Sequence, residues 1–189
     1  INLCAENYFS IASAAIRKHD PNHMVMRCRF AGQIPEIADI AGKYSDVMTV
    51  NCYRTVDLET GRMADGFEDD LRKWHAACKR PMIITEWRFP ALDAGLPCKH
   101  GAGQRVPTQK DRTFAFTVFQ KLLFSTDFMV GSNFFMWADE PALGISSTFP
   151  EDSNYGLVNE QDQPYELLTQ RATELHALVY ALHGGNVPD

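Results

Sequence analysis

Residues 79–87 read KRPMIITEW. A turn signal over residues 79–81 precedes three apolar residues, which Thr85 and Glu86 follow. A short continuous apolar run after a turn is typical of a buried strand, and near-continuous hydrophobicity suits a parallel strand that helices cover. The stretch therefore predicts a parallel β-strand over residues 82–87.

Three other stretches of the chain have the same character. They are rich in Val, Ile, Met or Phe and cover residues 23–30, 47–53 and 130–137. Around them, apolar residues recur at helical spacing over residues 8–18, 34–44, 67–78, 114–124 and 165–182. Thr108 and Asp111 form a capping-box pattern before the fourth of these helices. A helix followed by four strand–helix units predicts an α/β fold with a parallel sheet and right-handed crossovers.

Four such units correspond to half of a (β/α)8 TIM barrel, which typically needs about 250 residues. We expect residues 1–189 to form a single domain, a half-barrel. Half a barrel has two open sheet edges, at residues 23–30 and 130–137, and an uncovered apolar inner face. The isolated chain is therefore expected to pair face to face as a homodimer, or to cover the sheet with its own loops and terminal segments.

The composition excludes several classes of partner. The net charge of −6 and the scattering of the 18 Lys and Arg residues argue against nucleic acid as a partner. No apolar run reaches the roughly 20 residues that span a bilayer, so we expect no membrane segment. Residues 1–8 show no signal peptide. If the chain is a fragment, that says nothing about export, and the location stays open between cytoplasmic and exported.

Metal and cofactor sites are not expected. The five cysteines are an odd number, are widely spaced and form no Cys-x-x-Cys pair. A zinc site is therefore disfavoured. The glycines in the sequence GAG, residues 101–103, neither follow a strand nor open a helix, so they predict flexibility in a long loop rather than a phosphate cradle.

Polar and aromatic side chains gather at the predicted ends of the strands, where parallel α/β barrels carry their active sites. Six of them are candidate site residues: Arg29, Asn51, Tyr53, Glu86, Trp87 and Trp137. Glu86 is the sharpest signal, because a carboxylate at the end of an apolar strand is costly to bury without a purpose or a partner. The alternative from spacing alone is a rim glutamate that pairs with Arg88 or Lys99.

Several motifs resemble the agarase-like members of the clan of retaining β-glycosidases that are built on this barrel. The sequences ITEW, residues 84–87, and FMWAD, residues 135–139, are similar to the ends of strands seven and eight in that clan. Residues 8–23 resemble the helix and turn that lead into strand five, and residues 152–165 resemble the segment after strand eight. The resemblance covers nearly the whole chain and implies that it contains strands five to eight.

The resemblance also implies roles for individual residues and an oligo- or polysaccharide as substrate. Glu86 matches the nucleophile, which attacks the anomeric carbon and forms a covalent intermediate. Trp137 matches the tryptophan that stacks on the sugar ring, and Tyr53 matches the residue that hydrogen-bonds the nucleophile. Alternatives remain open: Trp137 as a core aromatic, Tyr53 as a rim tyrosine, and Asn51 and Arg29 as residues that hold a loop.

The chain departs from the clan in one respect that matters for mechanism. Retaining hydrolysis needs a second carboxyl group, the acid/base, about 5 to 5.5 Å from the first. In the clan it belongs to an Asn-Glu pair that ends strand four, which would precede Ile1 here. The Asn159-Glu160 pair is expected to be a surface turn, and Glu140, next to Pro141, to shape a loop.

Two rival functions are kept beside the glycoside hydrolase. One is a non-catalytic half-barrel that binds carbohydrate through Trp87 and Trp137 or associates with itself. The other is a different barrel enzyme, such as a lyase or an aldolase. The absence of a lysine at any predicted strand end argues against Schiff-base chemistry. Whether this chain alone is an active enzyme is left open by the missing acid/base.

Overall fold

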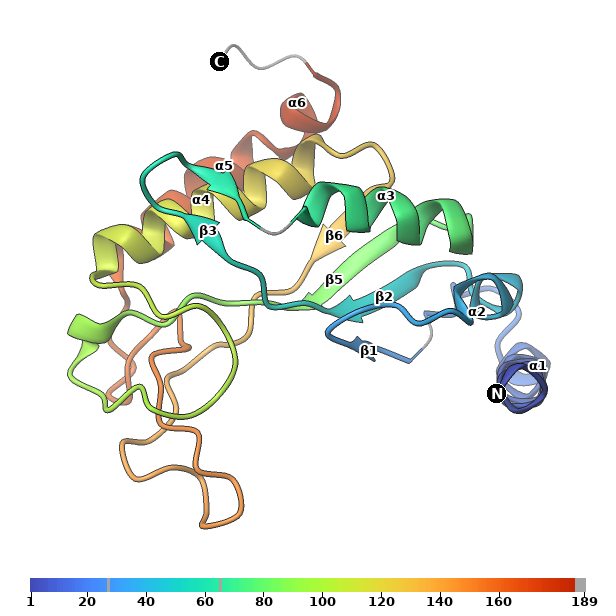
Figure 1. Cartoon of the computed structure of the whole chain (residues 1–189), viewed down its shortest axis with the longest axis horizontal. Helices are drawn as coiled ribbons and strands as arrows, with labels where there is room; N and C mark the ends of the chain where they lie inside the picture. The colour runs from blue at the N-terminus through green and yellow to red at the C-terminus, as the bar shows by residue number, and fades with distance from the viewer. Residues whose placement is uncertain (27, 65, 186–189) are drawn as a thin grey trace. The chain divides into compact units, whose positions relative to one another are not determined.

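A computed structural model describes residues 1–26, 28–64 and 66–185 (Figure 1). The chain divides into two compact units. Unit 1 consists of Ile1–Cys52, Gly66–Thr85 and Phe128–Asn133, except residue 27, and unit 2 holds the other described residues. No helix of the described part is both long and apolar enough to cross a membrane.

Unit 1 is built on a four-stranded sheet in the order β1-β2-β5-β6. The strands are β1 (Phe30–Ala31), β2 (Met48–Asn51), β5 (Met82–Glu86) and β6 (Met129–Ser132). β1 pairs in parallel with β2, and β5 pairs in parallel with β6. Met48 and Val50 of β2 and Met82 and Ile84 of β5 are fully buried, as near-continuous hydrophobicity predicts for covered strands, whereas Ile83 is only partly buried. The α/β fold with a parallel sheet is confirmed.

Three helices belong to unit 1: α1 (Asn2–His19), α2 (Ala38–Tyr44) and α3 (Phe67–Cys78). α2 packs against both α1 and α3 (Figure 1). A Cβ atom at Gly42 would lie 2.1 Å from the carbonyl oxygen of Cys78, so only glycine permits this approach of α2 to the end of α3. α3 has the predicted bounds, with three acidic residues in its first turn that complement the helix dipole.

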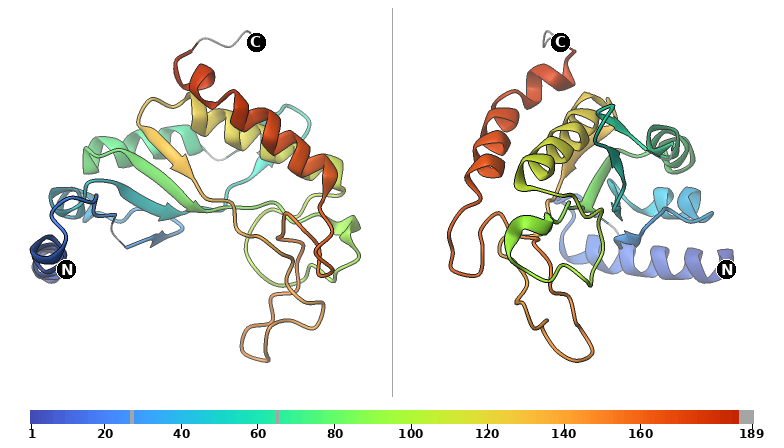
Figure 2. Two further views of the ribbon diagram at one scale, coloured as in Figure 1. Left: turned by 180° about the vertical axis from the view of Figure 1, so that it is seen from behind. Right: turned by 60° about the vertical axis from the view of Figure 1, so that its left-hand side comes forward.

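Unit 2 contains the hairpin of β3 (Val56–Asp57) and β4 (Arg62–Met63), the short 3-10 helix η1 (Leu92–Ala94), and the helices α4 (Gln109–Ser125), α5 (Glu166–Ala177) and α6 (Val179–His183). α4 and α5 lie side by side (Figure 2). The predicted capping box is present at the start of α4, where Thr108 accepts a hydrogen bond from the Asp111 backbone N–H and Asp111 accepts one from Thr108.

The main differences from prediction concern two strands, one helix and one hairpin. The strand predicted over residues 23–30 is regular only at Phe30–Ala31, with an isolated bridge from Met26 to Val47, and residue 27 lies outside the described residues. The strand predicted over residues 130–137 is regular only to Ser132; Asn133 and Phe135 still donate to the carbonyls of Ile84 and Trp87, and residues 136–139 bond to residues 155–158. The helix predicted over residues 165–182 is divided at Leu178. The β3–β4 hairpin was not predicted.

Candidate active site

Glu86 and Tyr53 form a hydrogen-bonded pair in unit 2. Glu86 is the last residue of β5, and Tyr53 follows the end of β2 by two residues. The Tyr53 hydroxyl donates to Glu86 Oε2 at 2.8 Å, and both side chains are half-buried. Burial raises the pKa of Tyr53 strongly, Arg88 opposes the rise, and the bond to Glu86 adds to it. Tyr53 therefore stays protonated and acts as a donor to Glu86.

Arg88 lies beside this pair and is almost completely buried. The centre of its guanidinium group is 4.9 Å from the Tyr53 ring centroid, 4.8 Å from that of Phe135 and 3.2 Å from that of Tyr155. Its Nη2 contacts the Glu151 carboxylate at 3.4 Å. Arg88 was considered from the sequence only as an ion-pair partner for Glu86, so the ring contacts were missed. The sequence signal for these contacts was the position of Arg88 between two aromatic residues, Trp87 and Phe89, directly after the end of a predicted strand.

Trp137 presents its indole to solvent. The residue is 68% exposed, although its carbonyl accepts hydrogen bonds from the backbone N–H groups of Leu157 and Val158. An exposed indole on an anchored backbone can offer a flat apolar face to the C–H groups of a sugar ring. The arrangement suits a stacking platform better than a core aromatic.

Trp87 lies in the core of unit 2. It is 1% exposed, and its ring packs against Phe116, Phe119 and Phe134, with centroid distances of 4.5 to 5.2 Å. No face of this indole is open to a sugar, so the expectation that Trp87 contacts carbohydrate is corrected to a packing role. Its Nε1 is buried without a hydrogen-bond partner among the described residues.

Asn51 and Arg29 belong to unit 1. Asn51 Oδ1 accepts a hydrogen bond from the Thr85 hydroxyl at 2.9 Å, which links the ends of the neighbouring strands β2 and β5. Arg29 is exposed, directly before β1. The contact of Asn51 is of the kind expected for a residue that holds a loop by a hydrogen bond.

Two carboxyl groups, those of Glu140 and Glu160, were weighed as substitutes for the missing acid/base, and they differ in their burial. Glu140 is 5% exposed, and burial raises the pKa of its carboxyl, with the negative charge of Glu151 adding to the rise. Glu160 is exposed, and Asn159 Oδ1 accepts the backbone N–H groups of Gln161 and Gln163. The Asn159-Glu160 pair is therefore the surface turn that the sequence predicts.

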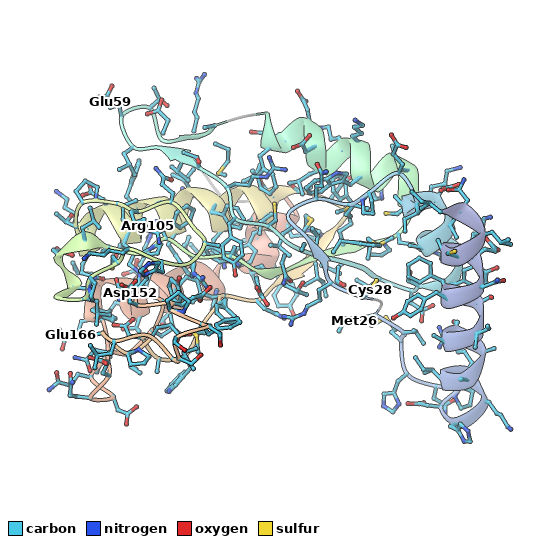
Figure 3. The ribbon with its side chains drawn as sticks, turned by 60° about the horizontal axis from the view of Figure 1, so that its bottom comes forward. Met26, Cys28, Glu59, Arg105, Asp152 and Glu166 are labelled. Atoms are coloured by element: carbon cyan, nitrogen blue, oxygen red, sulfur yellow. The ribbon has the colours of Figure 1, made fainter. Side chains whose placement is uncertain are left out.

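The loop over residues 95–107 is fastened to the segment around Asp152 (Figure 3). Asp152 Oδ1 accepts the backbone N–H groups of Lys99 and His100 at 2.9 and 2.8 Å. Arg105 Nε donates to the carbonyl of Cys98 at 3.0 Å, and the Cys98 N–H donates to the Asp152 carbonyl. These bonds hold within unit 2 a loop that the sequence predicted to be flexible.

Asp152 should make the stability of the protein depend on acid pH. Burial alone would raise the pKa of its carboxyl, but the hydrogen bonds from His100 and Lys99 outweigh burial and leave it below the usual 3.8. A depressed folded-state pKa stabilises the fold above the unfolded value, and this contribution is lost as pH falls through the folded value. We expect Asp152→Asn to lower the free energy of unfolding by about 1 kcal/mol at pH 7.

The check is urea unfolding of both proteins between pH 7 and pH 2. The difference in unfolding free energy should shrink below about pH 4, where the carboxyl of the unfolded chain becomes protonated. A difference that stays constant down to pH 2 would mean that the charge of Asp152 contributes nothing.

Across residues 1–26, 28–64 and 66–185, no three His, Cys, Asp or Glu side chains gather as they would around a metal ion. Cys52, Cys78 and Cys98 are buried free thiols, whereas Cys4 and Cys28 are exposed.

The sequence and the structure of the chain are both similar to those of beta-agarases. Beta-agarase B from Vibrio sp. (strain JT0107) is 32% identical over 184 residues, which are 96% of this chain and 18% of the agarase. The structure of an exo-beta-agarase matches with a TM-score of 0.81 and 26% identity, over 96% of this chain and 23% of that one. An agarase, AgWH50C, matches with a TM-score of 0.82 and 27% identity, over 96% and 26%.

No family model matches the chain. The chain spans less than a fifth of the length of the curated relatives that it matches. The sequence and structure matches nevertheless agree and confirm the resemblance to agarase-like enzymes. The chain is thus homologous, over nearly its whole length, to one segment of the beta-agarases, a group of glycoside hydrolases.

Proposed function

We propose that this chain is part of a retaining glycoside hydrolase that cleaves β-glycosidic bonds in a polysaccharide of the kind that agarases cleave. Glu86 is the nucleophile in this proposal. The observation that carries it is the 2.8 Å hydrogen bond from the Tyr53 hydroxyl to Glu86 Oε2 at the end of β5. A carboxylate that a neutral donor orients through one oxygen is suited to attack with the other.

In the proposed first step, Glu86 Oε1 forms a bond to the anomeric carbon while the bond from that carbon to the leaving oxygen breaks. A carboxylic acid from another segment protonates the leaving oxygen. In the second step, the same acid/base removes a proton from water, and the water oxygen replaces Glu86 on the anomeric carbon. Two inversions restore the original configuration.

We propose further that residues 1–189 form one domain, the half of a (β/α)8 barrel with strands five to eight. Strand four and the acid/base would then lie before residue 1. The share of the agarases that the chain covers supports this, as does the open position of β1 and β6 at the two edges of the sheet. On its own, such a chain would cover these edges by pairing with a second copy, or with its own segments.

Trp137 is proposed to form the sugar platform at the cleavage site. We expect Trp137→Ala to weaken the binding of an agarose oligosaccharide by about 1 to 3 kcal/mol, because a large apolar face is lost. Calorimetry on the purified protein measures this, with Trp74→Phe as a control at a buried tryptophan of unit 1. Unchanged affinity of the Trp137 variant would remove this residue from the site.

A further inference from the structure

The burial of Arg88 needs an explanation. The residue is 2% exposed, and its Nη1 is buried without a hydrogen-bond partner among the described residues. Its Nε donates to the Ala102 carbonyl at 3.1 Å, and its ion pair with Glu151 is long, at 3.4 Å. A buried cation with an unsatisfied donor and a long ion pair is costly, and an apolar side chain would avoid that cost.

Aromatic rings supply most of the surroundings of this cation. Tyr53, Phe135 and Tyr155 all place a ring within 4.9 Å of the guanidinium centre. A cation over a ring face is attracted by the ring's quadrupole, and more strongly so where water is excluded. The contact with Tyr53 therefore holds that ring, while the Tyr53 hydroxyl is held by Glu86.

The loop that contains Gly101 and Gly103 fixes Arg88 from the other side. A Cβ atom at Gly103 would lie 3.0 Å from the carbonyl oxygen of Arg88, and one at Gly101 would collide with the Tyr155 hydroxyl. Both glycines also have positive φ angles of about 100°. The two glycines allow the backbone to approach closely enough for the Ala102 carbonyl to accept from Arg88 Nε.

We infer that Arg88 is a positioning residue of the active site. Its guanidinium group, anchored by the Ala102 carbonyl and Glu151, holds the Tyr53 ring where the hydroxyl can donate to Glu86. This inference rests on the proposed function, in which Glu86 is the nucleophile. In the proposed mechanism, Arg88 touches neither the substrate nor the reacting atoms and acts through Tyr53.

The test is a double-mutant cycle in the full-length protein that carries this segment, with an agarose oligosaccharide as substrate. Arg88→Met keeps the length of the side chain and removes its charge. We expect it to lower kcat by about 10²-fold, the scale of a small misplacement of catalytic groups, and to leave KM nearly unchanged. Arg88→Lys, which retains a cation, should recover part of the loss. In a Tyr53→Phe background, Arg88→Met should have little further effect.

Arg105→Met is the matched control. Arg105 also fastens the loop, through the carbonyls of Cys98 and Gly103, and these hydrogen bonds reach neither Tyr53 nor Glu86. We expect this variant to retain kcat. An equal loss of kcat in Arg105→Met, or additive effects of Arg88→Met and Tyr53→Phe, would overturn the inference.

Two further readouts keep the outcomes separate. Circular dichroism and thermal unfolding show whether each variant is folded, and if Arg88→Met is not, the same cycle with Arg88→Lys decides. Activity that survives in Glu86→Ala would refute the proposed function. A Glu86→Ala protein without activity, together with additive Arg88 and Tyr53 effects, would refute only the role of Arg88.

Discussion

Replacement of Glu86 by alanine in the full-length protein that carries this segment is expected to lower kcat on the order of 10⁶-fold, as loss of a nucleophile does in other covalent mechanisms. The fold should be retained, because Glu86 is only half-buried at the end of β5. Hydrolysis of an agarose oligosaccharide is the measurement. Glu160→Ala, at an exposed glutamate in a turn, is the matched control.

Azide should partly restore cleavage by the Glu86→Ala protein. The space left by the carboxylate admits a small anion, which attacks the anomeric carbon once instead of twice. The glycosyl azide formed should therefore have the inverted configuration. Full activity in the alanine variant without azide would exclude Glu86 as the nucleophile.

Replacement of Asp139 by alanine should have the largest effect on stability. The Asp139 carboxylate accepts hydrogen bonds from Asn154 Nδ2 at 2.9 Å, from the Gly156 N–H at 2.7 Å and from the Tyr165 hydroxyl. Burial lowers the pKa of Arg112 to about 10, and the charge of Asp139 opposes that fall. Alanine leaves these three donors without their acceptor and removes a charge that favours the buried Arg112 cation, so we expect a loss of about 3 to 5 kcal/mol.

Thermal and urea unfolding of the purified protein measure this loss. Asp139→Asn should destabilise less, because it keeps one acceptor oxygen. Asp127→Ala, at an exposed residue of unit 2, should change the free energy of unfolding by less than about 0.5 kcal/mol. If Asp139→Ala resembles Asp127→Ala, the buried network does not stabilise unit 2.

The elements that could be predicted are those with strong local signals. α3 has a clear apolar face and acidic residues in its first turn, and α4 has a capping box, so their starts follow from residues close in sequence. The end of the strand predicted over residues 130–137 could not be predicted, because residues 136–139 bond to a segment about 20 residues further on, which no local pattern encodes. The strands β3 and β4 have two residues each, too few for any periodicity.

In the candidate site, too, some features could be predicted from the sequence and others could not. The Tyr53–Glu86 pair could be predicted from strand ends and the resemblance. The burial of Trp87 could have been predicted as well, since successive residues of a strand point to opposite sides and Glu86 was assigned to the site. The surroundings of Arg88 could not, because their rings come from positions 53, 135 and 155, which only the fold brings together.

If Glu86 forms a covalent bond to the sugar, the intermediate can be trapped. An activated 2-deoxy-2-fluoro glycoside of the matching sugar forms the intermediate but slows its hydrolysis, so the full-length protein should carry a sugar adduct that peptide mass spectrometry can locate. We expect the adduct on Glu86 and no adduct in Glu86→Gln. An adduct on another carboxylate, or no adduct together with an inverted hydrolysis product, would contradict it.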